Sequence, residues 1–184
     1  MRILPIIGTH AFYVLEGEEI SSETVSKDWK PSNDPASNWH GLGVVEENDL
    51  DPQYEGETTH YMPAPGGYVP RKSTYEAMTL QGQLLLQDMD ELVMALTFGA
   101  KMPDAEGDFI PGSAREKMRG WLKLQKYLAE DDQLVTIVDM WCELWLGSGI
   151  QHSRTPSKAT IAFRMLQSPL NVGKLSNLTA GGGD

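Results

Sequence analysis

Apolar and polar residues alternate with a period of two in the most hydrophobic parts of the chain. The pattern is clearest at residues 133–147, where alternate positions are mostly apolar and the opposite face would carry Trp141 and Trp145. Residues 158–167 alternate in the same way after a polar stretch. Because side chains of a strand point alternately to opposite faces, these two segments are predicted to be strands joined as a hairpin.

Further strands are predicted nearer the N-terminus. Residues 11–15 are a short apolar run, and residues 43–47 and 50–61 mix β-branched residues and Tyr with polar ones. In residues 71–87 the apolar side chains fall mostly on one face, which predicts a long strand facing a core. Residues 62–70 contain three prolines and two glycines and are predicted to be an exposed loop, because proline is excluded from central strands.

Residues 88–98 are predicted to be a helix. Asp88 is a candidate N-cap, and Gly99 is a candidate C-terminal stop. The apolar residues with helical spacing are Met89, Leu92, Val93 and Leu96.

Residues 115–130 fit both periodicities. Ser113 and Glu116 have the spacing of a capping box, which favours a helix. Leu122 and Leu124, however, alternate with polar and aromatic residues, as in a strand. A strand is favoured here, and the helical alternative stays open.

One β-rich domain is expected from length and composition. A chain of 184 residues with 40% hydrophobic residues can bury one sizeable core, and 18 Gly and 11 Pro favour many turns over long helices. Residues 1–38 are expected to hold a first strand and an extended arm, and residues 39–170 the β-rich domain with its helix. Residues 171–184 form a tail with too few apolar residues for a further element.

Charge is distributed unevenly along the chain. Residues 1–70 hold 12 acidic residues against 3 basic ones, a charge of −9, and residues 71–184 hold 14 against 12, a charge of −2, which together make the net −11. An acidic surface repels phosphate backbones, so a nucleic-acid-binding module is disfavoured.

The sequence holds no arrangement of side chains that indicates catalysis or zinc binding. The four histidines are widely separated, and no nucleophile motif or phosphate-binding loop occurs. Cys142 lies in a strongly apolar run without a neighbouring His, which predicts a buried, unreactive thiol. We expect no catalytic residue, no metal and no cofactor, with non-EF calcium binding at acidic residues 46–57 or 104–108 left open.

The first residues of the chain also carry no targeting signal. Their apolar patch is too short for a membrane span, and no cleavage pattern of small residues follows it. No membrane anchor is therefore expected.

Several features have no role inside a simple monomer. They are an extended arm at residues 21–38, loops at residues 62–70 and 101–114, and the outward-facing Trp141 and Trp145. A monomer rarely exposes so much irregular chain and aromatic surface, so repeated contact between copies would explain these features together. The alternative is that both tryptophans lie in a two-sided core.

An ordered series of short motifs runs along the chain. It consists of Trp29-Lys30-Pro31, Trp39 with Leu42-Gly43-Val44-Val45-Glu46, the acidic strand through Glu55 and Glu57, the strand at 71–87, Asp88 opening the helix, and the closing strand pair. In this order and spacing the chain resembles the tail-tube proteins of long-tailed phages and prophages. The resemblance spans roughly residues 1–175.

The resemblance implies an antiparallel β-sandwich or barrel with one flanking helix, in a structural virion protein without enzymatic activity. Copies would form hexameric rings that stack into a tail tube and contact other tail proteins, and genomic DNA would pass through an acidic lumen without sequence-specific binding. The protein would be made in the bacterial cytoplasm and reside in the virion tail. The predicted inter-subunit contacts are Trp29, Pro31, Trp39, Tyr61, Tyr68, Arg71, Phe109, Trp141 and Trp145.

Two other classes of protein fit the same sequence. Another virion component, such as a tail terminator, a connector or a capsid decoration protein, would share the acidity, the loops and the missing catalytic motifs. A small acidic ligand-binding or hydrolytic β-barrel would instead be a stable monomer with a pocket.

Overall fold

The structure is a computed structural model, and it describes residues 6–32, 38–87, 90–128, 134–149 and 158–175. Strands dominate these residues, and one helix lies wholly within them. The elements are β1 (Ile6–Leu15), β2 (Glu19–Ile20), β3 (Glu23–Thr24), β4 (His40–Glu55), β5 (Thr58–Ala64), β6 (Gly67–Thr74), β7 (Ala77–Leu86), α2 (Glu91–Phe98), β8 (Met118–Leu128), β9 (Leu134–Ser148), β10 (Ala159–Met165) and β11 (Val172–Leu175).

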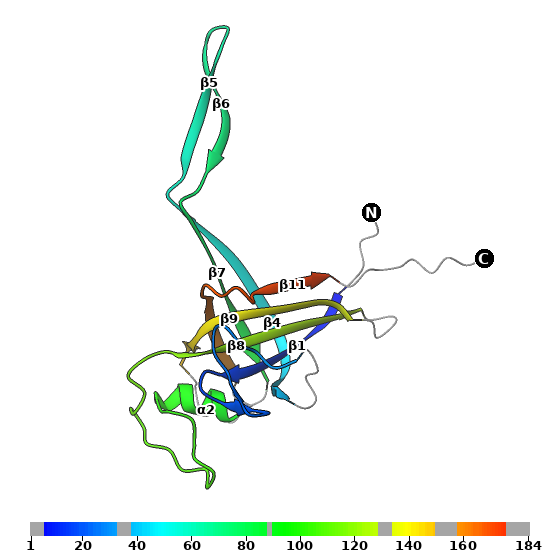
Figure 1. Cartoon of the computed structure of the whole chain (residues 1–184), viewed down its shortest axis with the longest axis vertical. Coiled ribbons are helices and arrows are strands. Elements are labelled where there is room, and N and C mark those ends of the chain that lie inside the picture. Colours follow the sequence, from blue (N-terminus) through cyan, green and yellow to red (C-terminus); the bar gives the residue numbers. More distant parts are fainter. Residues whose placement is uncertain (1–5, 33–37, 88–89, 129–133, 150–157, 176–184) are drawn as a thin grey trace, which may run out of the picture.

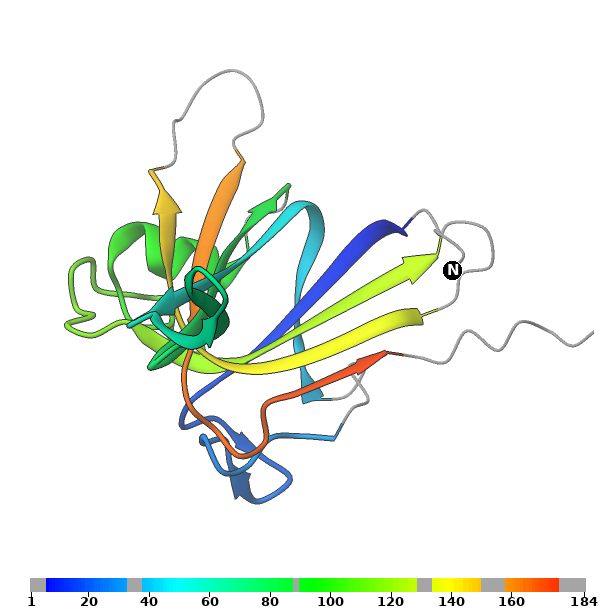
Figure 2. The same cartoon turned by 90° about the horizontal axis from the view of Figure 1, so that it is seen from above.

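Six strands close into an antiparallel barrel (Figures 1 and 2). Neighbours follow the order β10-β7-β4-β1-β8-β9, and β9 pairs back with β10. β11 pairs with the first half of β9, beside the closed part of the barrel. The predicted antiparallel, mainly β fold with one flanking helix is confirmed, and the pairing of β9 with β10 closes it as a barrel.

The inside of the barrel is the main hydrophobic core. Met140, Cys142 and Leu144 of β9 face it, as their alternation predicts, and so do Leu84 and Leu86 of β7. Cys142 is fully buried, and burial raises the pKa of its thiol. The prediction of a buried thiol is confirmed.

Helix α2 packs against the core with the stripe that its sequence predicts. Leu92 and Val93 are buried there. The predicted N-cap, Asp88, lies outside the described residues, and the cap is Asp90, whose carboxylate accepts the backbone N–H of Leu92. Gly99 ends the helix in the left-handed conformation, with φ of 56°.

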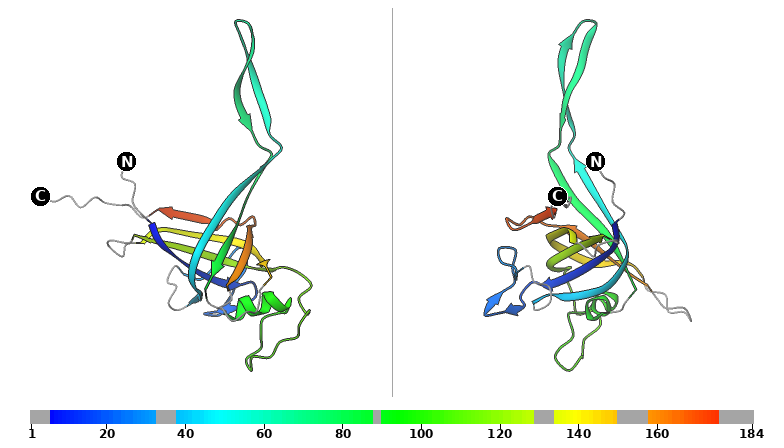
Figure 3. Two further views of the ribbon diagram at one scale, coloured as in Figure 1. Left: turned by 180° about the vertical axis from the view of Figure 1, so that it is seen from behind. Right: turned by 90° about the vertical axis from the view of Figure 1, so that its right-hand side faces the viewer.

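β5 and β6 form a separate two-stranded sheet that projects from the barrel (Figures 1 and 3). The prediction of a loop at residues 62–70 is therefore wrong, because both strands run through that segment. Pro63 and Pro70 lie in strands that pair only with each other in the described part of the chain. Each strand of such a hairpin is an edge, where proline is tolerated. The predicted exposure of the segment is confirmed.

Strand β4 is longer than its sequence predicts. The expected strands at residues 43–47 and 50–61 are replaced by β4, which is continuous apart from irregularities near Gly43 and Glu46, and by β5. β7 pairs with β4 from Val45 to Glu55 and so supplies hydrogen-bond partners to its polar stretch. Long-range pairing therefore carries the strand through residues that are locally poor strand formers.

The two other strand predictions have different outcomes. The segment at residues 71–87 is divided, since β6 ends at Thr74 and β7 begins at Ala77. Within residues 115–130, β8 confirms the favoured strand, and the helical alternative is wrong.

Both extensions of the chain fold back on the barrel. β2 and β3 make a small hairpin within residues 16–32, which we call the arm from here on. The predicted arm at residues 21–38 overlaps this segment, and its residues 33–37 lie outside the described residues. The prediction that the tail holds no further element is wrong, because β11 pairs with β9 from Val172 to Leu175. The backbone pairing with β9, rather than apolar side chains, determines this strand.

Candidate assembly surfaces

A second hydrophobic cluster lies on the outer side of the barrel, beneath the arm. It contains Val14 of β1, Val25 of the arm, and Trp39, Trp121 and Trp141. Trp141 is only 3% exposed and Trp39 only 8%. The Trp121 indole donates to two backbone carbonyls of the arm, at 2.9 and 3.2 Å. For Trp141, the alternative of a two-sided core is confirmed.

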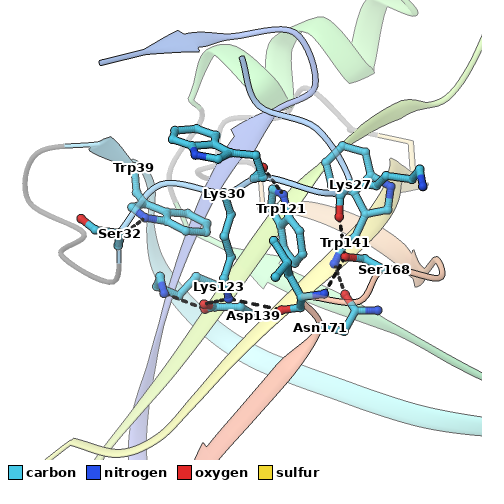
Figure 4. Close-up of polar contacts among 12 residues, drawn as sticks. Lys27, Lys30, Ser32, Trp39, Trp121, Lys123, Asp139, Trp141, Ser168 and Asn171 are labelled. Carbon is cyan, nitrogen blue, oxygen red and sulfur yellow. Dashed lines mark hydrogen bonds and ion pairs between the residues drawn. The ribbon is translucent and has the colours of Figure 1, made fainter. Parts of the chain in front are cut away.

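One buried carboxylate joins the arm to the barrel (Figure 4). Asp139 of β9 lies 2.6 Å from the ammonium of Lys123 on β8 and 2.6 Å from the ammonium of Lys30 in the arm. The Asp139 and Lys123 side chains are fully buried, and the Lys30 side chain is 15% exposed. Lys123 also lies over the Trp39 ring, at 4.5 Å, and Lys30 over the Trp121 ring, at 5.2 Å. The ion pair of Lys30 with Asp139 and its cation–π contact with Trp121 therefore hold the arm on the barrel.

The buried environment changes the electrostatics of Lys123. Desolvation lowers its pKa below the ordinary value, Asp139 opposes this shift, and the Lys30 charge adds to it. Sequence reasoning missed this ion cluster. The available signal was Asp139 between Val138 and Met140, because a charge within an apolar strand needs a partner.

The C-terminal segment after β10 packs on the same cluster (Figure 4). Ser168 donates its hydroxyl to the Lys27 carbonyl at 2.6 Å. The Asn171 side chain accepts the backbone N–H of Trp141 at 2.8 Å. The arm, the barrel and the C-terminal segment are thus joined by hydrogen bonds at one place.

The predicted contact residues fall into two groups. Trp29, Pro31, Trp39 and Trp141 are buried or half-buried within their own chain, and little of their surface is available to another copy. The other predicted contacts are the exposed Tyr61, Tyr68 and Arg71 and the half-buried Phe109 and Trp145. The inter-subunit role of all these residues stays a prediction.

The projecting β5–β6 hairpin carries exposed aromatic and aliphatic side chains. Tyr61 is 60% exposed and Tyr68 76%, and Met62 and Val69 are also exposed. A two-stranded hairpin has no core of its own and is marginally stable alone. Its apolar side chains are therefore suited to contact with another surface.

The ribbon below this hairpin, residues 49–55 of β4 with residues 77–80 of β7, has one apolar face. Leu50, Tyr54 and Met78 lie on it and are 36%, 53% and 54% exposed. This face continues the inward face of the barrel beyond the closed core. Apolar surface of this kind is normally covered by protein.

A third exposed apolar surface lies at the opposite end of the long axis, near α2 (Figure 1). The Phe98 and Phe109 rings are 5.1 Å apart, and Ile110 is 74% exposed. An open groove of about 510 Å³ lies in the same region. Its lining includes Met102, Met118, Lys101, Arg115, Lys117 and Arg119.

The described residues show no group of three or more His, Cys, Asp or Glu side chains that could hold a metal ion. In the loop at residues 104–108, the Asp104 carboxylate accepts the backbone N–H groups of Glu106 and Asp108, at 3.0 and 2.9 Å. Asp104 thus closes its own loop. Within the same described residues, no helix has the length and apolar character needed to cross a bilayer.

His40 is expected to titrate above its ordinary pKa of 6.5. Its imidazole lies 2.9 Å from the Glu18 carboxylate, and this hydrogen bond raises the pKa more than burial lowers it. The pairing contributes stability that is present below the unfolded-state pKa and is lost as pH rises through the folded-state pKa.

Proton NMR titration of His40 in Glu18→Gln should show a midpoint below that of the native protein, whereas Glu19→Gln is the matched control and should leave it unchanged. Equal midpoints in all three proteins would contradict the role of Glu18.

No protein-family model matches the chain, and no curated protein matches it. Among solved structures, the chain is similar to one in the "Cryo-EM structure of the anti-feeding prophage (AFP) baseplate, 6-fold symmetrised". The match covers 97% of this chain and 100% of that chain, with a TM-score of 0.45 and 8% sequence identity. This similarity is too weak to support an argument about function.

Proposed function

We propose that this chain is a non-enzymatic structural protein of the virion, which polymerises into stacked hexameric rings that form a phage tail tube. The observation that carries the proposal is the ribbon, which leaves the barrel with an exposed apolar face and with edges that are unpaired among the described residues. The tube is the conduit for genomic DNA and contacts other tail proteins. The protein resides in the virion tail after synthesis in the bacterial cytoplasm.

The edges of the ribbon support contacts around a ring. In the described part of the chain, β1 pairs with β4 only as far as Val45, and β10 pairs with β7 only from Gln81 onward. Each strand of the ribbon therefore has an edge without a strand partner there. An unpaired edge on each side can take a neighbour on each side, and a repeated contact of this kind forms a ring when its rotation closes.

The two ends of the molecule support stacking of rings. The apolar hairpin lies at one end of the long axis, and the surface with Phe98, Phe109 and Ile110 lies at the other (Figure 1). Contact between unlike ends of successive copies is heterologous, and it continues as an open stack when successive copies are displaced along the tube axis.

Negative-stain microscopy tests the proposal. Purified protein, concentrated or mixed with a tail-tip nucleus, should form tubes or stacked rings. Met78→Asp should abolish them, because it places a charge on the apolar face of the ribbon. Thr24→Asp, at an exposed position of the arm, is the matched control and should assemble normally.

Thermal unfolding shows whether Met78→Asp loses only the ability to form tubes or also the stability of the folded chain. Both variants change exposed side chains, so each should keep the stability of the native monomer to within about 0.5 kcal/mol. A native protein that stays monomeric under all these conditions would overturn the proposal. A single ring that never elongates would indicate a terminator or connector instead.

A further inference from the structure

The groove of about 510 Å³ lies beside the loop that joins α2 to β8, residues 99–117, at the end of the molecule opposite the hairpin (Figure 1). The corner where β1 ends and β8 begins forms its other side. Leu15, Met102 and Met118 supply apolar surface to its lining. Leu15 is buried, and both methionines are half-buried and pack against the main core. The base of the groove is therefore apolar and continuous with the core.

Hydrogen bonds hold the loop beside the groove in place. The backbone N–H of Ala114 donates to the Gly99 carbonyl at 2.9 Å. The Ser113 hydroxyl accepts the backbone N–H of Lys101 at 3.0 Å. These bonds tie the two ends of the loop together at the C-terminal end of α2. The groove is therefore preformed, and a ligand does not have to order the loop when it binds.

The lining of the groove carries an excess of positive charge, although the chain as a whole has a net charge of −11. Four cationic side chains face two carboxylates there, and the six residues are Lys101, Arg115, Lys117, Arg119, Glu16 and Glu116. Most of the cations come from the start of β8 and the residues before it, since residues 115–126 hold five of the 15 Lys and Arg residues and a single acidic one. The local charge of the groove is thus opposite in sign to that of the chain.

Two of these four cations are not engaged within the chain. Arg119 forms an ion pair with Glu16 at 2.9 Å, and Lys117 lies 3.8 Å from the centre of an indole ring of β9 and 3.9 Å from a carboxylate of the same strand. Lys101 and Arg115 are exposed, and neither forms an ion pair with another of the described residues. Their charges are therefore available to an anionic ligand.

Backbone groups next to these cations also lack partners. Arg115 and Glu116 lie at the end of the loop, just before β8, and within the described part of the chain no backbone hydrogen bond involves either residue. Their N–H and C=O groups resemble the edge of a sheet, to which an extended peptide can add through its own backbone. This favours an extended ligand.

We propose that the groove binds an extended acidic segment of a partner protein. Carboxylates of the segment would pair with Lys101 and Arg115, and an apolar side chain between them would cover the two methionines, whose flexible thioethers adapt to different shapes. A volume of about 510 Å³ is in the range of ligand pockets and suits a few residues rather than a folded surface. This proposal does not depend on tube formation.

The chain's own acidic run is not a suitable occupant. Residues 46–57 hold its densest group of carboxylates, but β7 pairs with β4 from Val45 to Glu55. This run is therefore part of a two-stranded ribbon and cannot enter the groove as a single extended segment. For this reason we assign the occupant to a different protein.

Fluorescence anisotropy with synthetic peptides tests the chemistry of the occupant. A rhodamine-labelled decapeptide of alternating Glu and Leu should bind the protein at low salt and dissociate as salt rises. Decapeptides of alternating Lys and Leu, and of alternating Glu and Ser, should each bind roughly tenfold or more weakly than it. Equal binding of the first would overturn the assignment of an acidic segment, and equal binding of the second would overturn the role of the apolar base. Absence of binding by the Glu–Leu decapeptide would overturn the whole proposal.

Charge reversal tests the location. Lys101→Glu/Arg115→Glu should weaken binding of the Glu–Leu decapeptide roughly tenfold or more. Arg71→Glu/Lys72→Glu changes the net charge equally at exposed positions of β6 and should bind as the native protein does. Equal weakening in the two variants would reduce the effect to net charge and overturn the site.

Methionine methyl NMR of unassembled protein gives a readout that does not depend on charge. The decapeptide should shift the methyl resonances of Met102 and Met118 and leave that of Met140, which is buried inside the barrel, unchanged. Shifts confined to other methionines would place the peptide elsewhere and overturn the proposal. Loss of tubes in Lys101→Glu/Arg115→Glu alone would place a second copy in the groove and overturn the assignment to a different protein. That result is distinct from failure of the proposed function, in which the native protein forms no tubes.

Discussion

Asp139→Ala is expected to lower the free energy of unfolding by about 3–5 kcal/mol. The substitution leaves the fully buried Lys123 ammonium without the carboxylate that lies 2.6 Å away, and it also removes the partner of Lys30. A buried charge that loses its partner bears its desolvation cost without compensation. Chemical denaturation followed by tryptophan fluorescence measures the change, since Trp121 and Trp141 report on the same region.

Two control proteins separate this effect from a general loss of charge. Asp28→Ala breaks the ion pair between Asp28 and Lys27, and each of these side chains is 61% exposed. This variant should change the free energy of unfolding by less than about 1 kcal/mol. Lys123→Met/Asp139→Leu replaces the fully buried pair with apolar side chains and should recover the part of the stability loss that comes from Lys123, while Lys30 still lacks its carboxylate. A native stability in Asp139→Ala would contradict the structural role of the cluster.

Leu92→Ala is expected to cost about 2–5 kcal/mol of stability. Leu92 is fully buried where α2 packs against the core, so truncation removes apolar contacts and leaves a cavity. Ile110→Ala is the matched control, since Ile110 is 74% exposed, and it should change stability by less than about 0.5 kcal/mol. Thermal unfolding gives the midpoint temperature of each variant, and the midpoint of Leu92→Ala should be the lower one. Equal midpoints for the two variants would show that α2 does not pack on the core.

The arrangement of the arm narrows the choice of assembly contacts. Trp39 and Trp141 serve a second core within the chain, so they have little area left for a neighbour. The proposed contacts between rings therefore rest on Tyr61, Tyr68 and the surface near Phe109, which are accessible.

Strand and helix predictions succeeded where a local pattern carried the information. The alternation along β9 and β10 identified both strands and their pairing, and the spacing of Leu92 and Val93 identified the inner side of α2. The errors had two causes, a distant partner for β11 and the presence of proline in the strands of the hairpin. β11 depends on pairing with β9, and the hairpin through residues 62–70 depends on two edge strands that accept proline.

Sequence by itself therefore determined the mainly β class, the core-facing side of β9, the helix and the buried Cys142, because each follows from spacing within one segment. Only the tertiary structure decided that the barrel closes and which of its outer halves is covered. The contact between Lys30 and Asp139 joins residues 109 positions apart, and local periodicity carries no information on such a contact. The same long-range packing leaves the apolar face of the ribbon uncovered, which is why the proposed contact surfaces emerge from the folded chain.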